Sequence, residues 1–229
     1  MRNQRVVGMV VSVVVVLSGT ARAEEGIRTD RLSGKALEAW SSIVAIVTAE
    51  DEGGRPLHPA LRAVWDAVDA SGCVIFVELP DPKSRRSYIL GRFAIARVDS
   101  EGKATEGVLV MNLPAIDRAA SGPGAARRNG FIPFAGLTKK RRYAEVLGHE
   151  LAHAAWSFAD ADRTQLTMTL PGEVAELSQR VLAAGTEDVS EETLKRAREL
   201  DRLSREVEEA AEAAEEAIWA ELLAGHRAR

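Results

Sequence analysis

The alternation of apolar and polar positions predicts helices first, then strands, in the first half of the chain. Apolar residues recur at helical spacing over 34–49, and Pro59 opens a second amphipathic segment that Gly72 ends. Period-two and continuous apolar runs predict three strands, at 73–77, 88–98 and 107–113. The turn at 99–102 ends in glycine, which accepts a positive φ, so we expect the last two strands to form a hairpin.

The second half of the chain has helical periodicity almost throughout. A connection at 114–137, rich in glycine and proline, is expected to be a long loop. Helices are predicted at 138–158, at 163–184 with Pro171 inside it, and from Ser190 to 224. The last is acidic and carries a single apolar stripe. Helices, then a small antiparallel or mixed sheet, then helices predict an α+β fold.

The N-terminal segment 1–23 has the pattern of a secretory signal peptide. Two arginines precede an apolar run at 6–17, and the small-x-small sequence Ala21-Arg22-Ala23 follows. We expect cleavage before Glu24, and the alternative is an uncleaved membrane anchor. Cleavage removes three arginines and no acids, so the formal charge changes from −4 to −7. The mature protein is therefore expected in the periplasm or secreted, without stable insertion in the membrane.

Composition excludes several classes of protein. An apolar content of 46% with modest net charge is enough to bury a core, so a disordered chain is not expected. The net negative charge argues against binding of nucleic acid phosphates. The single cysteine, Cys73, excludes an intrachain disulfide and any zinc site made of cysteines.

Two of the four histidines lie in the pattern H-E-x-x-H, formed by His149, Glu150 and His153. In a helix, a spacing of four residues places both imidazoles on one face, where they can share a metal ion. Glu150 is offset from that face and can take a proton from metal-bound water. Uncharged residues flank the motif, as a helix buried behind a metal site requires. The alternative is two surface histidines on an ordinary amphipathic helix.

Around this motif, the sequence resembles the zincin metallopeptidases, in which a small sheet precedes the active-site helix. The resemblance implies a catalytic domain at 24–185, followed by the C-terminal helix at 186–229. It implies Zn²⁺ held by His149 and His153, with Glu150 as general base. It also implies an edge strand that holds extended substrate, and the segment 107–112 is the expected candidate.

A catalytic zinc takes a third protein ligand. The metzincin continuation is absent, because Trp156 and Ala159 occupy the glycine and third-histidine positions. If the helices at 138–158 and 163–184 form a hairpin, Glu173 comes closest to facing the histidines. It lies 24 residues after His149, a spacing similar to that of thermolysin-like gluzincins, although their N-E-x-x-S-D motif is absent. The other candidates are Glu176, Asp160 and Asp162.

Other residues could assist at such a site. Glu145, one turn before His149, could orient its ring or be solvated. Tyr143, Tyr88 and His58 are candidates to stabilise an oxyanion, although packing or surface roles are the commoner ones. The basic run at 139–142 could attract acidic substrate, but such runs are usually solvated.

Two functions remain. The first is an exported zinc-dependent peptidase acting on peptide or protein substrates through a zinc-bound water. The second is a non-catalytic binding or scaffold protein of the cell envelope that keeps a zincin fold. In either case the long final helix could cover the other elements or mediate self-association, and no nucleic acid partner is expected. The intact Glu150 favours the peptidase.

Overall fold

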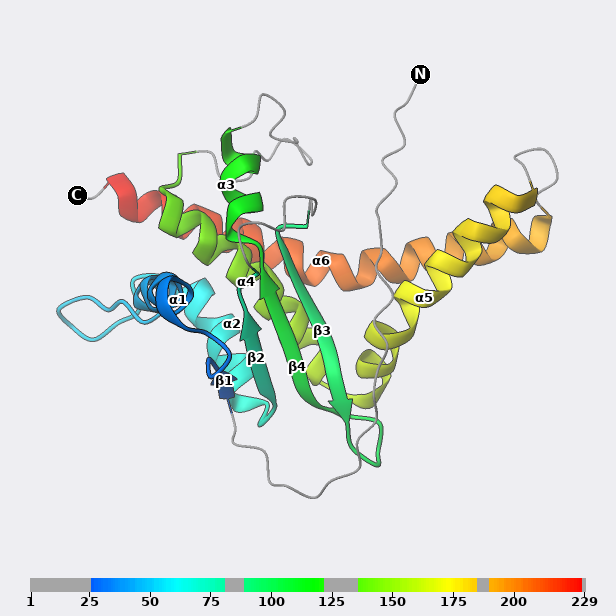
Figure 1. Cartoon of the computed structure of the whole chain (residues 1–229), viewed down its shortest axis with the longest axis horizontal. Coiled ribbons are helices and arrows are strands. Elements are labelled where there is room, and N and C mark those ends of the chain that lie inside the picture. Colours follow the sequence, from blue (N-terminus) through cyan, green and yellow to red (C-terminus); the bar gives the residue numbers. More distant parts are fainter. Residues whose placement is uncertain (1–25, 81–88, 122–135, 185–189, 228–229) are drawn as a thin grey trace.

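The structure, a computed structural model, describes residues 26–80, 89–121, 136–184 and 190–227 (Figure 1). The predicted signal peptide and Tyr88 lie outside these residues. The elements are β1 Gly26–Arg28, α1 Gly34–Val47, α2 Pro59–Ala70, β2 Val74–Glu78, β3 Gly91–Val98, β4 Ala104–Met111, α3 Leu113–Ser121, α4 Lys139–Phe158, α5 Ala161–Ala184 and α6 Glu191–Arg227. Over the described residues the fold is α+β, which confirms the predicted class; it has six helices and a small mixed sheet of four strands, of which α3 and β1 were not predicted.

The four strands are ordered β1-β2-β4-β3. β1, β2 and β4 are parallel, and β3 is antiparallel to β4. The predicted hairpin between β3 and β4 is confirmed. In its turn, Asp99 Oδ1 accepts the N–H groups of Glu101 and Lys103, and Gly102 has a φ of 80°.

The prediction that 107–112 is the edge strand was wrong. This segment belongs to β4, which lies between β2 and β3, and the antiparallel edge strand is β3. The physical reason is burial. Leu109 and Met111, on one face of β4, are completely buried in the core, whereas most β3 residues are partly exposed.

The long loop predicted at 114–137 is helical at its start. α3 begins at Leu113, and the side chain of Asn112 accepts the N–H of Ala115 at 3.1 Å, which satisfies a free donor of the first turn. Ile116 is completely buried and ties α3 to the core. The remainder of the predicted loop, 122–135, lies outside the described residues.

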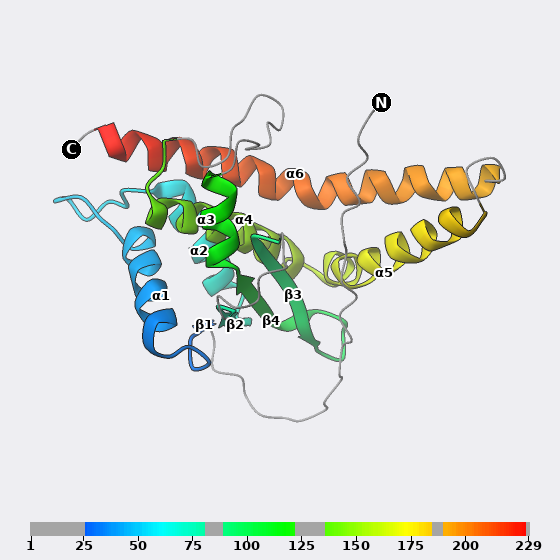
Figure 2. The same cartoon turned by 45° about the horizontal axis from the view of Figure 1, so that its top comes forward.

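Helix α4 lies at the centre of the molecule. It contacts α1, α2 and α6 as well as β3 and β4 (Figure 2). Most of its surface is therefore covered, and its buried apolar residues are Tyr143, Ala144, Val146, Leu147, Leu151, Ala152, Ala154 and Phe158. This explains why the residues around the motif are uncharged.

The packing partner of α4 differs from the predicted one. α5 meets α4 near the connection between them, where Thr164 Oγ1 donates to the Ser157 carbonyl at 2.8 Å. α5 then diverges, and α6 returns along it and continues over α4 (Figures 1 and 2). The predicted cap of α6 is confirmed, since Thr193 N–H donates to Ser190 Oγ at 3.2 Å.

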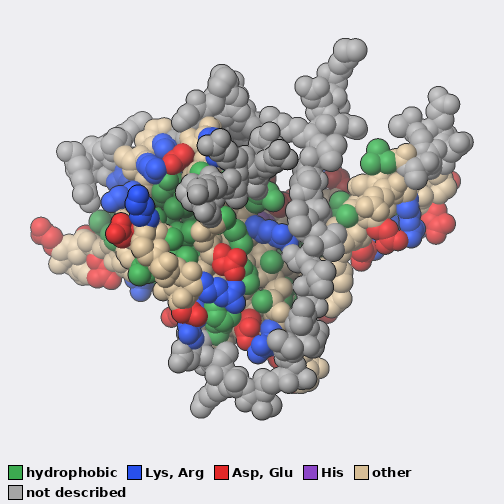
Figure 3. Space-filling model, viewed as in Figure 1, with side chains coloured by type: hydrophobic (Ala, Val, Ile, Leu, Met, Phe, Trp, Pro, Cys, Tyr) green, Lys and Arg blue, Asp and Glu red, His purple; other side chains and the backbone are tan. Residues whose placement is uncertain are grey.

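Beyond α4, the far part of α5 and the first part of α6 project from the body together. Figure 3 shows side chains of both charges along this projection and a hydrophobic group near its end. Leu182 is 82% exposed and Leu194 is 46% exposed, whereas Leu200 is buried between the helices. The apolar stripe of α6 is thus buried where α6 crosses the body, at Ala211, Ile218 and Leu222.

Candidate metal centre

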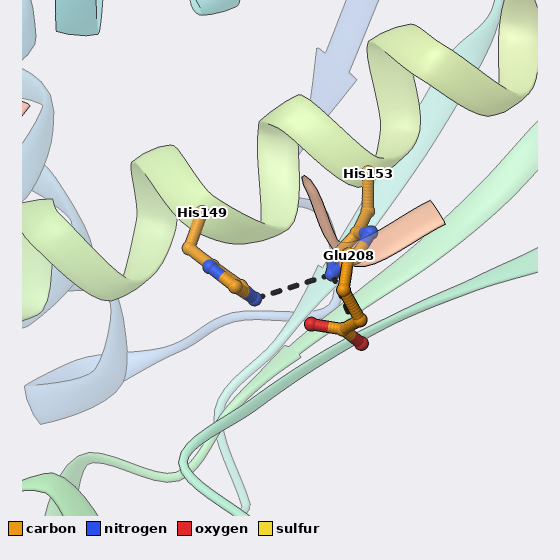
Figure 4. A group of neighbouring side chains, drawn as sticks. All are labelled: His149, His153 and Glu208. Carbon is orange, nitrogen blue, oxygen red and sulfur yellow. Dashed lines mark hydrogen bonds and ion pairs between the residues drawn. The ribbon is translucent and has the colours of Figure 1, made fainter. Parts of the chain in front are cut away.

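His149 and His153 point from one face of α4 toward α6 (Figure 4). Their Nε2 atoms are 3.2 Å apart. Two nitrogen ligands of a tetrahedral zinc ion, each about 2.0–2.1 Å from it, lie about 3.3 Å from one another. The spacing of the two imidazoles therefore fits a shared ion.

A carboxylate of α6 completes the group. Glu208 Oε1 lies 3.9 Å from His153 Nε2. Each of the three residues, His149, His153 and Glu208, offers one possible ligand atom, and these three atoms all lie within 4.8 Å of one another (Figure 4). Two imidazoles and a carboxylate are a donor set of catalytic zinc sites, which leave a fourth position for water. The residues present thus have the donor types that could hold a metal ion such as zinc.

Glu215, two turns after Glu208 on α6, contacts the other nitrogen of His149. Its Oε2 lies 3.2 Å from Nδ1, which is within ion-pair distance. A carboxylate at Nδ1 favours the tautomer with the proton there, which leaves the Nε2 lone pair for a metal. The role that the sequence suggested for Glu145 is thus occupied by Glu215, while Glu145 is completely buried in α4.

The structure does not bring Glu173 into this group. Its carboxylate pairs with Arg196 of α6 on the surface of the α5–α6 projection. Glu176 pairs with Arg180, and Asp160 with Arg163. The physical reason for Glu173 and Glu176 is the divergence of α5 from α4, which carries these carboxylates away and lets α6 face the histidines instead.

The two histidines have opposite pKa shifts. Burial and, to a smaller extent, the charge of the neighbouring His149 together lower the pKa of His153 to about 4. Burial also opposes the charge on His149, but the carboxylates of Glu215, Glu150 and Glu208 outweigh it and raise its pKa. His153 is therefore neutral at pH 7, with a lone pair available for a metal.

Glu150 lies on the other side of the motif, between α4 and the edge strand β3. Its side chain is almost completely buried, and burial raises its pKa to about 7. The positive charge of His149 and the backbone N–H of Phe93 act in the opposite direction. A carboxyl group whose pKa is near 7 can both accept and deliver a proton at neutral pH.

Gly148, directly before the motif, lets α6 approach α4 closely. A Cβ atom on Gly148 would lie 2.4 Å from Ile218 Cδ1 of α6 and 3.1 Å from Leu61 Cδ1 of α2. Polar contacts hold α6 at this place. The Glu221 carboxylate accepts the N–H of Ala60 at 2.8 Å, and Arg141 donates to the carbonyl of Leu222 at 2.6 Å.

We expect Gly148→Ala to destabilise the protein by about 1–3 kcal/mol, the usual cost of overpacking a core. In an open helix the same change would stabilise by up to about 1 kcal/mol. Gly172→Ala in α5 is the matched control, because no atom lies within 4 Å of its added Cβ. Urea unfolding measures both. Equal stability of the two variants would contradict a close approach of α6 at Gly148.

The other predicted residues have structural partners. Tyr143 donates to Asp117 Oδ2 at 3.0 Å, and Lys139 pairs with the same carboxylate at 2.7 Å. In the same basic run, Arg141 donates to the carbonyl of Leu222 of α6, whereas Lys139 and Lys140 are exposed. His58 is buried at the start of α2.

The sequence reasoning missed Glu208 and Glu215. A signal was present, because they lie seven residues apart on α6 and thus on one face, next to the apolar positions 207, 211, 214 and 218. Acidic residues next to an apolar stripe lie close to whatever element the stripe packs against. For α6 that element is α4.

Searches of protein-family models, curated proteins and solved structures found no match to this chain. No helix within the described residues combines the length and apolar character needed to cross a membrane.

Proposed function

We propose that this protein is an exported zinc-dependent peptidase with a zincin-like arrangement of sheet and active-site helix. The observation that carries the proposal is the convergence of His149, His153 and Glu208, with the buried Glu150 next to His149 in the sequence of α4. Two imidazoles, a carboxylate and an adjacent carboxyl with pKa near 7 supply the parts that hydrolysis of a peptide bond needs.

In this proposal His149, His153 and Glu208 hold the ion, and Glu208 replaces Glu173 as third ligand. Bound zinc would polarise the scissile carbonyl and lower the pKa of its water. Glu150 would be the group that accepts a proton from the attacking water and delivers it to the leaving amine. Glu215 holds the tautomer of His149, and the low pKa of His153 keeps its ring neutral.

The position of β3 supports a peptide as substrate. β3 is the antiparallel edge strand of the described sheet and contacts α4. An edge strand offers N–H and C=O groups to an extended chain, which can add as a further strand. In β3 the N–H of Phe93 is directed at Glu150, so a substrate would pair with the other outward groups. The substrate is therefore proposed at β3, in place of the segment 107–112.

Export remains part of the proposal. It rests on the signal-like segment 1–23, with the mature chain beginning at Glu24 in the periplasm or outside the cell.

We expect Glu208→Gln to weaken zinc binding by more than about 10²-fold and to remove zinc-dependent cleavage of unstructured peptides. An amide oxygen is a poorer ligand than a carboxylate, and even changes to groups behind the ligands cost about 10–100-fold. Competition with a chromogenic chelator measures the affinity.

Glu173→Gln is the matched control, because Glu173 pairs with Arg196 at the surface. Its zinc affinity and activity should equal those of the wild type. If Glu173→Gln loses zinc and Glu208→Gln keeps it, the assignment of α6 as the source of the third ligand is wrong. If the wild type binds zinc but cleaves nothing in the peptide panel, the scaffold function is favoured.

A further inference from the structure

The register of β3 and β4 determines which N–H groups of β3 point away from the sheet. Asn112 N–H donates to the Leu90 carbonyl at 2.8 Å, so these two residues form a hydrogen-bonded pair. In an antiparallel ladder such pairs alternate with pairs whose N–H and C=O groups point outward. Phe93, opposite Leu109, is of the second kind. Its N–H therefore points to the unpaired side of β3.

Glu150 meets β3 on that side. The N–H of Phe93 acts on its carboxylate as a hydrogen-bond donor. The aromatic ring of Phe93 packs edge-on against Phe158 of α4, with centroids 5.4 Å apart. β3 and α4 are thus joined by an apolar contact at the end of α4 and by a polar contact at the motif itself.

Gly91 provides the space that this arrangement needs. A Cβ atom on Gly91 would lie 2.6 Å from Glu150 Oε1, 2.7 Å from Glu150 Cγ and 2.8 Å from Val146 Cγ1. Real Cβ contacts do not come so close. The backbone of Gly91 has no positive φ, so its conformation would accept alanine. What glycine supplies at this position is room for Glu150.

We propose that Gly91 is a positioning residue that, together with the backbone N–H of Phe93, holds the Glu150 side chain in one place against β3. This inference rests on the proposed function, in which Glu150 is the general base. A glutamate side chain has three rotatable bonds, and a base must lie within hydrogen-bond reach of the proton it takes. Contacts that restrict those bonds keep the carboxylate within reach.

The test is Gly91→Ala. The added methyl group displaces the Glu150 carboxylate, and a displacement of about 1 Å near the reacting groups can cost about 10²-fold in rate. We expect kcat to fall by about 10- to 100-fold with zinc content unchanged, because the atoms nearest to the added methyl group belong to Glu150 and Val146 and to neither histidine. Gly172→Ala, which adds a methyl group in open space, should keep the wild-type kcat.

A second variant separates positioning from packing. In Gly91→Ala/Val146→Ala the clash with Val146 is removed, but the clash with Glu150 stays. We expect the thermal midpoint to recover toward that of Val146→Ala, while kcat stays low. A kcat that recovers together with stability would overturn the positioning role.

Unfolding of Gly91→Ala in the wild-type and Glu150→Ala backgrounds tests the contact without any activity. The loss of stability should be at least twofold smaller when Glu150 is absent. Equal losses in the two backgrounds would overturn the contact, whether or not the protein is a peptidase. Coupling in a protein that cleaves no peptide would leave the placement of Glu150 standing and remove the proposed function instead.

Discussion

Replacing Glu150 by glutamine is expected to abolish peptide hydrolysis while the fold and the zinc content stay unchanged. The amide is nearly isosteric with the carboxyl group, so the buried contact with β3 is kept in shape. Glutamine cannot act as a base, and general-base assistance is typically worth about 10²–10⁴ in rate. His149, His153 and Glu208 would still bind zinc, because Glu150 is not in their group.

The measurement is a pair of values for each variant, the zinc content and the rate of cleavage of unstructured peptides. Glu176→Gln is the control for the same chemical change, since Glu176 lies at the surface in an ion pair with Arg180. It should have wild-type activity. A Glu150→Gln variant that cleaves as fast as the wild type would show that another group is the base.

Replacing His153 by alanine is expected to remove zinc altogether. Only His149 and Glu208 would remain, and two protein ligands do not complete a zinc site. His153 is also well suited to bind at neutral pH, because with a pKa of about 4 it needs to lose no proton there. Replacing His153 therefore removes a ligand nitrogen that is unprotonated, and so free to bind the metal, at neutral pH.

The loss should be visible in stability as well as in metal analysis. A ligand at 100 times its dissociation constant stabilises the native state by about 2.7 kcal/mol. Added zinc should therefore raise the melting temperature of the wild type and of Glu150→Gln, but not that of His153→Ala. Full zinc occupancy in His153→Ala would refute the histidine pair as ligands.

The sequence by itself determined most of the elements, but not β1 or α3. Helical periodicity predicted α1, α2, α4, α5 and α6, and turn chemistry predicted the hairpin of β3 and β4. Spacing alone placed His149 and His153 on one helix face, because residues four apart in a helix are neighbours whatever surrounds them. These features depend on contacts between residues close in the chain, which a single sequence displays directly.

The start of α3 was hidden for a local reason. The segment 114–137 is rich in glycine and proline, yet α3 begins there. Its first turn is capped by the side chain of Asn112, and Ile116 packs in the core. The cap and the buried side chain both stabilise the first turn, which is the costly step in forming a helix. They therefore allow a helix to begin in a segment whose average composition favours a loop.

Only the tertiary structure decided which elements meet. The position of β4 inside the sheet depends on its pairing with β2. The carboxylate next to the two histidines comes from α6, because α6 rather than α5 covers α4 there. Gly91 and Gly148 are needed because a Cβ atom there would clash with Glu150 and with Ile218, which lie far from them in sequence. Periodicity shows that a face is apolar but not which of several apolar faces covers it. That choice is made by shape and by close packing between distant residues.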